Sequence, residues 1–284
     1  MADVVKGQRP VPTISLIIST YNRPDALQAV VEGCFAQTDK NFEIVITDDG
    51  SDARTRACVE QLRARSPVPL EYVWQPDDGY RLAMARNRGI LASRGNYVVV
   101  LDGDCIPQPD FIAQHRKLAC AGYLVTGSRI LLDQPTSERV IAGQLDVRLL
   151  DTVTILGLRL RGAINKMLPL LWKLPDIGRA SKRFTWRRIK GCNMGFWRTD
   201  LERVNGFDES FVGWGHEDAD LVVRLFHAGV MRKDGAFATE VFHLWHREAQ
   251  RDQETSNRKV VLERAAARVT QATIGLREHA NTAG

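Results

Sequence analysis

The chain has 284 residues, of which 44% are hydrophobic, and its formal net charge is +5. This composition is typical of a globular protein with one large domain or two small ones. No stretch approaches the roughly 20 consecutive apolar residues of a membrane helix, and the N-terminal segment lacks the apolar core of a signal peptide. Five widely spaced cysteines without a Cys-x-x-Cys pair argue against a disulfide framework and a zinc ribbon. We therefore expect a cytoplasmic protein.

Over the first third of the chain, apolar β-branched runs alternate with segments of helical apolar spacing. The expected elements, in chain order, are a strand at 14–19, a helix at 25–36, a strand at 42–47, a helix at 53–65, a strand at 70–74, a helix at 81–92 and a strand at 97–101. This alternation predicts an α/β fold with a mostly parallel sheet flanked by helices. The loops 19–23, 48–51 and 102–104 would then meet at the carboxyl edge of the sheet, where ligands bind in such folds.

The last of these strands runs into Asp102-Gly103-Asp104, which places two carboxylates at its carboxyl end. Ionised groups tolerate partial burial when they are paired or bind a metal, so one interpretation is a divalent cation that holds a diphosphate. The other is an ordinary turn, because Asp and Gly are frequent turn residues. The chain has no G-x-G-x-x-G after its first strand and no G-x-x-x-x-G-K-[ST], which argues against a dinucleotide site or a P-loop. Phosphates would then need cations instead of a glycine cradle.

Several arginines follow the third expected strand. Arg81, Arg86 and Arg88 lie at the start of the next helix, just after the loop Asp78-Gly79-Tyr80. They are either solvated helix charges or, for one or two of them, cations that neutralise a diphosphate.

The alternation ends near residue 130, and a basic segment follows. Residues 148–190 contain eleven Lys or Arg and two Asp, so this segment carries +9 and the rest of the chain −4. We expect a helical insertion over 129–190, with four apolar residues facing inward or into an interface: Leu156, Leu160, Ile164 and Met167. The segment either docks on an anionic membrane or glycan or forms a solvated basic face. Nucleic-acid binding through 179–190 would leave the acidic motifs unexplained.

The motif Gly213-Trp214-Gly215-His216-Glu217-Asp218 opens an expected helix at 216–229. Acidic residues stabilise a helix N-terminus, and this role alone would explain Glu217 or Asp218. It does not explain Trp214 between two glycines, which would present an aromatic face of the kind on which a sugar ring stacks. A carboxylate beside that ring is suited to take a proton from a sugar hydroxyl.

Two histidines, His243 and His246, lie on an expected short strand at 240–246. They are either structural or, together with carboxylate oxygens, ligands of Mn²⁺ and less suitably of Mg²⁺. The polar tail that begins at Glu248 is expected to be helical and to fray at its end.

In this order, the motifs resemble those of the family 2 inverting glycosyltransferases, which have the GT-A fold. The matching segments are 19–24, 48–51, 79–89, 101–104, 190–196, 206–209 and 213–218. The second half is similar to the C-terminal part of β-1,4-galactosyltransferases, and the whole resembles bacterial chondroitin polymerase domains. The resemblance covers about residues 12–250 and implies one GT-A domain over 1–250. This domain would comprise a Rossmann-like nucleotide-sugar half at 10–128, the basic insertion at 129–190 and an acceptor half at 189–250, followed by a helical tail at 251–284.

Position by position, the resemblance implies a binding site for a UDP-sugar. Ser19 and Tyr21 would surround the uridine, and Asp49 would hydrogen-bond the uracil edge. Asp102 would face the ribose and the water shell of a metal. The other positions implied to bind the nucleotide sugar are Arg23, Arg81, Arg86, Gly191 and Trp214.

The resemblance also implies a metal site and a catalytic base. Asp104 and His246 would bind Mn²⁺ or Mg²⁺, and His243 occupies the position of a methionine ligand in the galactosyltransferases. Asp218 would be the base, and Glu217 would bind the acceptor or orient the base.

The implied reaction is metal-dependent transfer, with inversion, of a hexose or N-acetylhexosamine from a UDP-sugar to a hydroxyl of a glycan or lipid-linked glycan. Such a protein would act in bacterial surface polysaccharide or lipopolysaccharide synthesis, in the cytoplasm or peripherally at the inner face of the cell membrane. The donor sugar stays open, because His216 and Cys192 stand where the galactosyltransferases carry glycines. The alternative is a non-catalytic protein that binds a sugar nucleotide, an anionic glycan or a membrane. A nucleotidyltransferase is disfavoured, because no Gly-rich basic loop follows the first strand.

Overall fold

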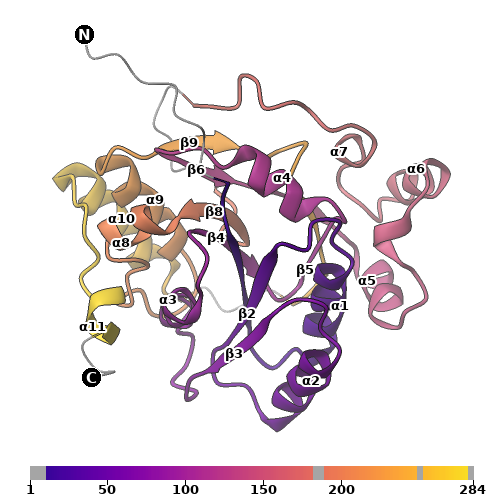
Figure 1. Cartoon of the computed structure of the whole chain (residues 1–284), viewed down its shortest axis with the longest axis horizontal. Helices are drawn as coiled ribbons and strands as arrows, with labels where there is room; N and C mark the ends of the chain where they lie inside the picture. Colours follow the sequence, from indigo (N-terminus) through magenta and orange to yellow (C-terminus); the bar gives the residue numbers. More distant parts are fainter. Residues whose placement is uncertain (1–10, 182–188, 248–251, 281–284) are drawn as a thin grey trace.

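The computed structural model describes residues 11–181, 189–247 and 252–280 (Figure 1). The strands are β1 (Ile14–Thr20), β2 (Phe42–Asp48), β3 (Leu70–Trp74), β4 (Tyr97–Asp102), β5 (Cys105–Pro107), β6 (Tyr123–Thr126), β7 (Ser128–Leu131), β8 (Asn193–Trp197), β9 (Met231–Asp234) and β10 (Glu240–His243). The helices are α1 (Pro24–Phe35), α2 (Ala53–Ala64), α3 (Leu82–Ala92), α4 (Phe111–Leu118), α5 (Gln134–Ile141), η1 (Val147–Leu149), α6 (Thr152–Leu160), α7 (Leu168–Leu171), α8 (Arg198–Arg203), α9 (Glu217–His227), α10 (Glu254–Ala267) and α11 (Leu276–Ala280).

The centre of the molecule is a seven-stranded sheet in the order β3-β2-β1-β4-β8-β6-β9. The four N-terminal strands form a parallel block, since β1 pairs in parallel with β2 and β4, and β2 with β3. β8 then runs antiparallel to both β4 and β6, which makes the sheet mixed. The predicted α/β fold with a mostly parallel sheet is therefore confirmed.

Helices cover both faces of this sheet, so its strands are buried on both sides (Figure 1). Side chains alternate along β1: Leu16 and Ile18 enter one core with α1 and α2, while Ile17 enters the other with α3, α8 and α9. α1 begins with Pro24, whose fixed φ suits a first helical turn, and buries Leu27 and other apolar residues at the predicted spacing. This packing fixes the carboxyl ends of β1, β2 and β4 at one edge.

A second, three-stranded sheet has the order β5-β10-β7 and brings late residues of the chain beside the end of β4. β10 is antiparallel to β5 and parallel to β7. The predicted strand at 240–246 is too long, because β10 ends at His243 and the Leu244 amide donates to the carbonyl oxygen of Asp104 at 2.9 Å. His246 therefore lies on a loop beyond the strand.

The segment 129–190, predicted to be a helical insertion, contains α5, η1, α6 and α7 within its described part. Its first residues belong to β7, so they form part of the second sheet. In Figure 1 the helices α5, α6 and α7 form a lobe at one side of the molecule. No helix in the described part of the chain is long and apolar enough to cross a membrane.

The C-terminal tail packs back onto the domain. Arg264 of α10 donates to Asp208 and to Asp220 of α9, each at 2.8 Å, and Leu276 of α11 is buried in the core beside α3. The tail contains the helices α10 and α11, and long-range ion pairs hold it against the domain. The predicted fraying falls on residues 281–284, which lie outside the described residues.

Candidate active site

Two connected clefts lie along the carboxyl edge of the sheet. The first, of about 470 Å³, is lined by residues from β1, β4 and β10, and the second, of about 540 Å³, by residues from α3, α9 and α10. The two clefts share a wall made of Tyr80, Leu82, Asp102, Arg129 and Trp214. A ligand in one cleft is therefore close to the contents of the other.

The Asp102-Gly103-Asp104 turn lies at the junction of these clefts. The amide of Gly103 donates to the carbonyl oxygen of Ser19 at 2.8 Å, and a Cβ at position 103 would lie 2.7 Å from that oxygen. Glycine is thus required for the turn to approach β1 so closely. The two aspartates have different partners: Asp102 pairs with Arg86 at 2.9 Å, whereas Asp104 lies beside two histidines.

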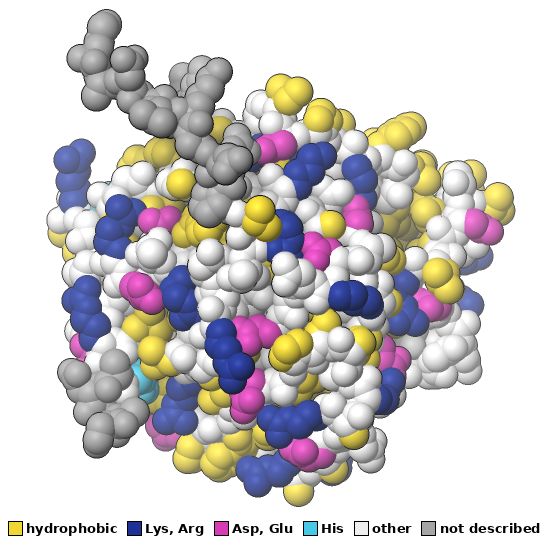
Figure 2. Space-filling view, in the orientation of Figure 1, with side chains coloured by type: hydrophobic (Ala, Val, Ile, Leu, Met, Phe, Trp, Pro, Cys, Tyr) yellow, Lys and Arg dark blue, Asp and Glu magenta, His cyan; other side chains and the backbone are white. Residues whose placement is uncertain are grey.

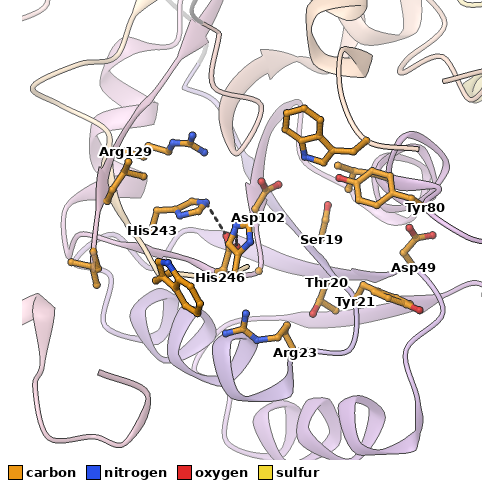
Figure 3. A pocket seen from close by; sticks show the side chains of 17 residues that line it. Ser19, Thr20, Tyr21, Arg23, Asp49, Tyr80, Asp102, Arg129, His243 and His246 are labelled. Carbon is orange, nitrogen blue, oxygen red and sulfur yellow. Dashed lines mark ion pairs between the residues drawn. The ribbon is translucent and has the colours of Figure 1, made fainter. Parts of the chain in front are cut away.

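Asp104, His243 and His246 offer one ligand atom each, and these atoms all lie within 4.8 Å of one another. Asp104 lies 3.7 Å from Nε2 of His243 and 3.4 Å from Nε2 of His246 (Figure 3). Burial lowers the pKa of His243, which favours the neutral imidazole that coordinates a metal. Two imidazole nitrogens and a carboxylate oxygen fit Mn²⁺ better than Mg²⁺. The predicted ligands are thus brought together.

Ser19, Tyr21, Arg23 and Asp49, which are predicted to bind the nucleotide, also line the first cleft, and Figure 3 shows Ser19, Tyr21 and Asp49 on the side away from the histidines. Asp49 accepts hydrogen bonds from Nε2 of Gln75 at 2.6 Å and from the Arg81 amide at 2.8 Å. Burial raises the pKa of Asp49 to about 6. A carboxylate has about four lone pairs, so these two bonds leave acceptor capacity for an N–H group of a base.

The prediction that the Arg81 side chain binds the nucleotide sugar needs correction. Its guanidinium forms an ion pair with Asp78 at the protein surface, and Arg81 lines neither of the two clefts. Its backbone amide alone reaches the site, through Asp49. For Arg81 the structure supports the other interpretation, a solvated charge at the start of a helix.

Arg86 also has a different place from the one predicted. It is 1% exposed, and its guanidinium donates to Asp102 at 2.9 Å, to Glu217 at 3.1 Å and to the carbonyl oxygen of Gly191 at 3.2 Å. The ring of Phe207 covers it at 5.1 Å. Arg86 also lines the second cleft, and both of its ion pairs are with acids that border a cleft. It thereby links the strand-end turn to the start of α9.

Glu217 and Asp218 begin α9 and line the second cleft. Burial, and after it the charge of Asp218, raises the pKa of Glu217 to about 7. The Asp218 carboxylate lies against Gly191, where a Cβ would be 2.6 Å from Oδ2. The Ala219 amide donates to Oδ1 of Asp218 at 2.7 Å. Arg86 pairs with Glu217 at 3.1 Å, whereas no cation pairs with the Asp218 carboxylate within the described residues.

The Gly213-Trp214-Gly215 loop is held in place by the tail helix. Asn257 of α10 donates to the carbonyl oxygen of Gly215 at 3.0 Å, and the Gly213 amide donates to that of Tyr80 at 3.1 Å. The φ values of Gly213, Gly215 and His216 are 77°, 101° and 75°, in the region that favours glycine. These bonds fix Trp214 at the shared wall, and Asn257 is a positioning residue that local sequence patterns do not reveal.

Arg129 is a second site residue that the sequence analysis does not single out. It lies on β7 beside His243 and lines both clefts (Figure 3). Within the described ranges no hydrogen bond or ion pair engages its guanidinium. The strand Ser128–Leu131 is too short to show a periodic pattern, and its pairing with β10 depends on residues more than a hundred positions later.

Comparison with known proteins agrees with this geometry. Residues 15–169, more than half of the chain, match the model of glycosyl transferase family 2. The chain belongs to glycosyltransferase family 2. Residues 177–247 match a second model, described as the N-terminal domain of galactosyltransferase, so this family member has a galactosyltransferase-like second half.

Curated relatives of this family 2 chain include polysaccharide synthases. The chondroitin synthase of Escherichia coli is 28% identical over 80% of this chain and 34% of its own length. Validoxylamine A glucosyltransferase of Streptomyces hygroscopicus subsp. jinggangensis is 29% identical over 78% of this chain and 53% of its own length. The hyaluronan synthase of Pasteurella multocida is 26% identical over 79% of this chain and 24% of its own length. The chain therefore spans about a quarter to a half of these relatives.

Solved structures of similar fold include two complexes with a nucleotide or a nucleotide sugar. TarS residues 1–349 of S. aureus, in complex with UDP, has a TM-score of 0.57 at 14% identity and covers 93% of this chain and 68% of that one. The mannosyltransferase PcManGT of Pyrobaculum calidifontis was solved in complex with GDP-Man and Mn²⁺. It has a TM-score of 0.56 at 17% identity, and the match covers 98% of this chain and 83% of that one. These likenesses support the GT-A-like fold.

Proposed function

We propose that this glycosyltransferase is metal-dependent and moves a hexose or N-acetylhexosamine, with inversion, from a UDP-sugar to a glycan hydroxyl. One observation carries the proposal: Asp104 with His243 and His246 in the first cleft, and Asp218 in the second, lie on either side of the wall formed by Asp102 and Trp214. That arrangement places a leaving diphosphate and an attacking hydroxyl in adjoining spaces, as a single displacement requires.

The first cleft would take the donor. Asp49 has acceptor capacity for the uracil N3–H, and Tyr21 and Ser19 line the same end of the cleft. The structure of TarS with UDP supports a uridine nucleotide, whereas PcManGT was solved with GDP-Man. We place the protein in the cytoplasm, where UDP-sugars are synthesised.

The leaving diphosphate needs positive charge. Mn²⁺ or Mg²⁺ on Asp104, His243 and His246 would supply it as a Lewis acid. Arg129, next to His243 and unpaired within the described residues, offers a second positive charge to the same phosphates. This side chain takes the role that the sequence pattern suggested for Arg81 and Arg86.

The second cleft would take the acceptor, a glycan or lipid-linked glycan. The Asp218 carboxylate takes the proton of an acceptor hydroxyl, whose oxygen attacks the anomeric carbon as the bond to the UDP oxygen breaks. Attack opposite the diphosphate inverts the configuration, so an α-linked donor gives a β-glycoside. Arg86, paired with Glu217, would hold Asp102 in the wall between the two substrates. The polysaccharide synthases among the relatives support a role in surface polysaccharide or lipopolysaccharide synthesis.

A donor screen tests this function. UDP release is measured with UDP-Gal, UDP-GalNAc, UDP-Glc, UDP-GlcNAc and UDP-GlcA, each with Mn²⁺, Mg²⁺ or EDTA. We expect slow hydrolysis of at least one UDP-sugar that EDTA abolishes and Mn²⁺ restores better than Mg²⁺. Binding of UDP without turnover of any UDP-sugar, even with mixed glycan acceptors, would support the non-catalytic alternative and reject the proposal.

Replacement of the proposed base tests the second cleft. Asp218→Asn keeps the shape of the side chain and removes its ability to take a proton, so kcat should fall by about 10²-fold or more. UDP affinity, measured by calorimetry with Mn²⁺, should stay unchanged because Asp218 lies outside the first cleft. The control is Asp52→Asn, at an exposed helix N-cap where Asn caps equally well. Full turnover by Asp218→Asn would show that another group is the base.

A further inference from the structure

Exposed large hydrophobic side chains are concentrated in the lobe around α6 and α7. Eight of the eighteen in the described part of the chain lie between residues 149 and 177, about a tenth of the chain. In Figure 2 hydrophobic side chains gather at the upper right, over α6 and α7. A globular protein rarely exposes such a cluster without a binding partner.

Helix α6 is apolar on two opposite faces. Ile155 and Leu158 are buried in the core, whereas Val153, Leu156 and Leu160 are 80%, 45% and 78% exposed. The exposed three are spaced i, i+3 and i+7, so they form one row on the outer face of the helix. Leu149, 79% exposed, lies just before the helix at the same end as Val153. We call these four side chains the α6 apolar row.

The other apolar residues expected in this segment turn inward. Ile164 is fully buried and Met167 packs against the core. Ile164 and Met167 therefore follow the inward alternative, whereas Leu156 and Leu160 are exposed and their contact with an interface stays a prediction. Sequence spacing did not distinguish the two, because both pairs are aliphatic and follow a helical period.

Four of the seven basic residues that the structure describes in this segment are bonded to neighbouring residues. Ion pairs or hydrogen bonds to neighbouring residues hold Arg148, Lys166, Lys173 and Arg179. Arg159 and Arg161 differ: both are exposed at the C-terminal end of α6, and the described structure gives their guanidinium groups no partner. The residues Lys182, Arg183, Arg187 and Arg188 lie outside the described residues. The described part of the segment therefore has an apolar row with two exposed arginines beside it, and the choice between a docking surface and a solvated basic face stays a prediction.

The two acidic residues between positions 146 and 160, Asp146 and Asp151, are both engaged. Asp151 caps α6 and accepts a hydrogen bond from the Thr154 amide at 2.7 Å, and Asp146 pairs with Arg148 at 2.6 Å. Trp172, 61% exposed, follows α7 directly. Indole rings favour the boundary between water and lipid, and arginines favour anionic headgroups. These features together match an anionic lipid surface rather than a neutral protein surface.

We propose that the α6 apolar row docks this protein on an anionic lipid bilayer. Leu149, Val153, Leu156 and Leu160 enter the headgroup boundary, and Arg159 and Arg161 bind the anionic headgroups beside them. The contact is peripheral and goes beyond the transfer reaction, since it uses no residue of either cleft.

Co-sedimentation with vesicles tests the proposal. The full chain is mixed with phosphatidylcholine vesicles that contain or lack phosphatidylglycerol, at low and at high salt. We expect binding to the anionic vesicles that weakens at high salt, and little binding to the neutral ones. Val153→Asp combined with Leu160→Asp should lower the bound fraction at least about tenfold, because two aliphatic side chains no longer enter the boundary.

Two matched controls separate this contact from a general loss of solubility or charge. Leu262→Asp changes a 48% exposed leucine on α10, and Arg94→Gln removes an exposed arginine outside the lobe. Both should bind vesicles like the wild type, whereas Arg159→Gln with Arg161→Gln should lose the preference for anionic lipid. Circular dichroism and melting show that each variant is folded.

Three results would overturn the proposal. One is no sedimentation of the wild type with anionic vesicles at low salt. Another is an equal loss of binding in Leu262→Asp and in the double aspartate variant. The third is a dimer of the wild type in analytical ultracentrifugation without vesicles that is absent in the double aspartate variant. This result would show that a second copy of the chain covers the α6 apolar row.

Discussion

Two buried arginines secure the two ends of α9, and they differ in what surrounds them. At its N-terminal end, Arg86 of α3 bonds Glu217 and Asp102. Further along, Arg224 of α9 bonds Asp220 at 2.7 Å and the carbonyl oxygens of Val204 and Gly206. The same chemistry thus occurs at both places, a guanidinium with carboxylate and carbonyl acceptors.

The partners of the two arginines differ in exposure. The side chains of Asp102 and Glu217, which pair with Arg86, are 32% and 10% exposed, whereas that of Asp220, which pairs with Arg224, is 0% exposed. Both oxygens of Asp220 are occupied, since Arg264 of α10 bonds the second one. The Arg224 network is therefore closed and holds the scaffold, while the Arg86 network opens onto both clefts and belongs to the site.

Removal of Arg224 should have the largest effect on stability. Arg224→Met leaves buried acceptors without their donor, which costs about 3–5 kcal/mol of unfolding free energy. The melting temperature should fall by roughly 10 °C. The control Arg203→Met breaks an exposed pair with Asp200 and should change stability by less than about 0.5 kcal/mol. Equal melting of Arg224→Met and wild type would contradict a structural role for this network.

Removal of Arg86 should instead affect turnover most. Arg86→Met frees Asp102 and Glu217 to shift, and small displacements of positioning groups cost about 10²-fold in kcat. Stability should fall less than in Arg224→Met, because both carboxylates border clefts and can be hydrated. Arg86→Lys should recover part of the loss, since it restores charge without the forked geometry. The opposite result would be a melting temperature of Arg86→Met as low as that of Arg224→Met together with an unchanged kcat per folded molecule. Arg86 would then stabilise the scaffold, as Arg224 does, and would not belong to the site.

The pH dependence of turnover tests whether the ion pair between Arg86 and Glu217 contributes to the reaction. The pKa of Glu217 is raised to about 7, so it becomes ionised, and fully paired with Arg86, as the pH rises through that value. We expect kcat/KM to rise by several-fold over the same range and Glu217→Gln to flatten this limb. The control Glu71→Gln changes an exposed acid away from both clefts and should leave the profile as it is. If kcat/KM of Glu217→Gln rises with pH as in the wild type, the rise is due to another titratable group.

The same shift has a consequence for stability. The folded-state pKa of Glu217 lies above its ordinary value of 4.5, so the folded protein holds this proton more tightly than the unfolded chain does. The stabilisation is complete below pH 4.5 and is lost as the pH rises to about 7.

The smallest effect is expected at the residue that precedes Glu217. His216 has φ 75°, a left-handed conformation in which a side chain is strained. His216→Gly relieves this strain but loosens the unfolded chain, so the unfolding free energy should change by less than about 1 kcal/mol. His216→Val should cost more, because a β-branched residue is poorly tolerated there. Melting curves of the two variants compare these costs, and equal melting would show that the conformation relaxes.

Local patterns predicted much of the first half of the fold. Strands 14–19, 42–47, 70–74 and 97–101 match β1 to β4 to within a residue at each end, because buried parallel strands are continuous apolar runs. β5, β6 and β7 are three or four residues long, too short for a periodic signal, and they were not predicted. The predicted strand at 240–246 is longer than β10, because the apolar run continues past the point where pairing with β5 and β7 ends.

For the site, the motifs predicted which residues line the clefts better than what each one contacts. Asp104, His243 and His246 come together as predicted, since strand ends and their order along the chain suffice to place them. Arg81 and Arg86 share one motif, yet the first faces solvent and the second is buried. Helical spacing sets the direction of each side chain, but which direction is the interior depends on α9 and the loop at Gly191.

The sequence by itself determined the family, the parallel half of the sheet and the carboxylates at the strand ends, because these depend on local periodicity and on the order of motifs. Only the tertiary structure decided that Arg86 joins the two clefts, that Asn257 of the tail helix holds the Trp214 loop, and that α6 exposes its apolar row. Each of these contacts or exposures depends on how segments distant in the chain pack together. Such packing is set by the sum of many weak long-range interactions, which no local pattern records.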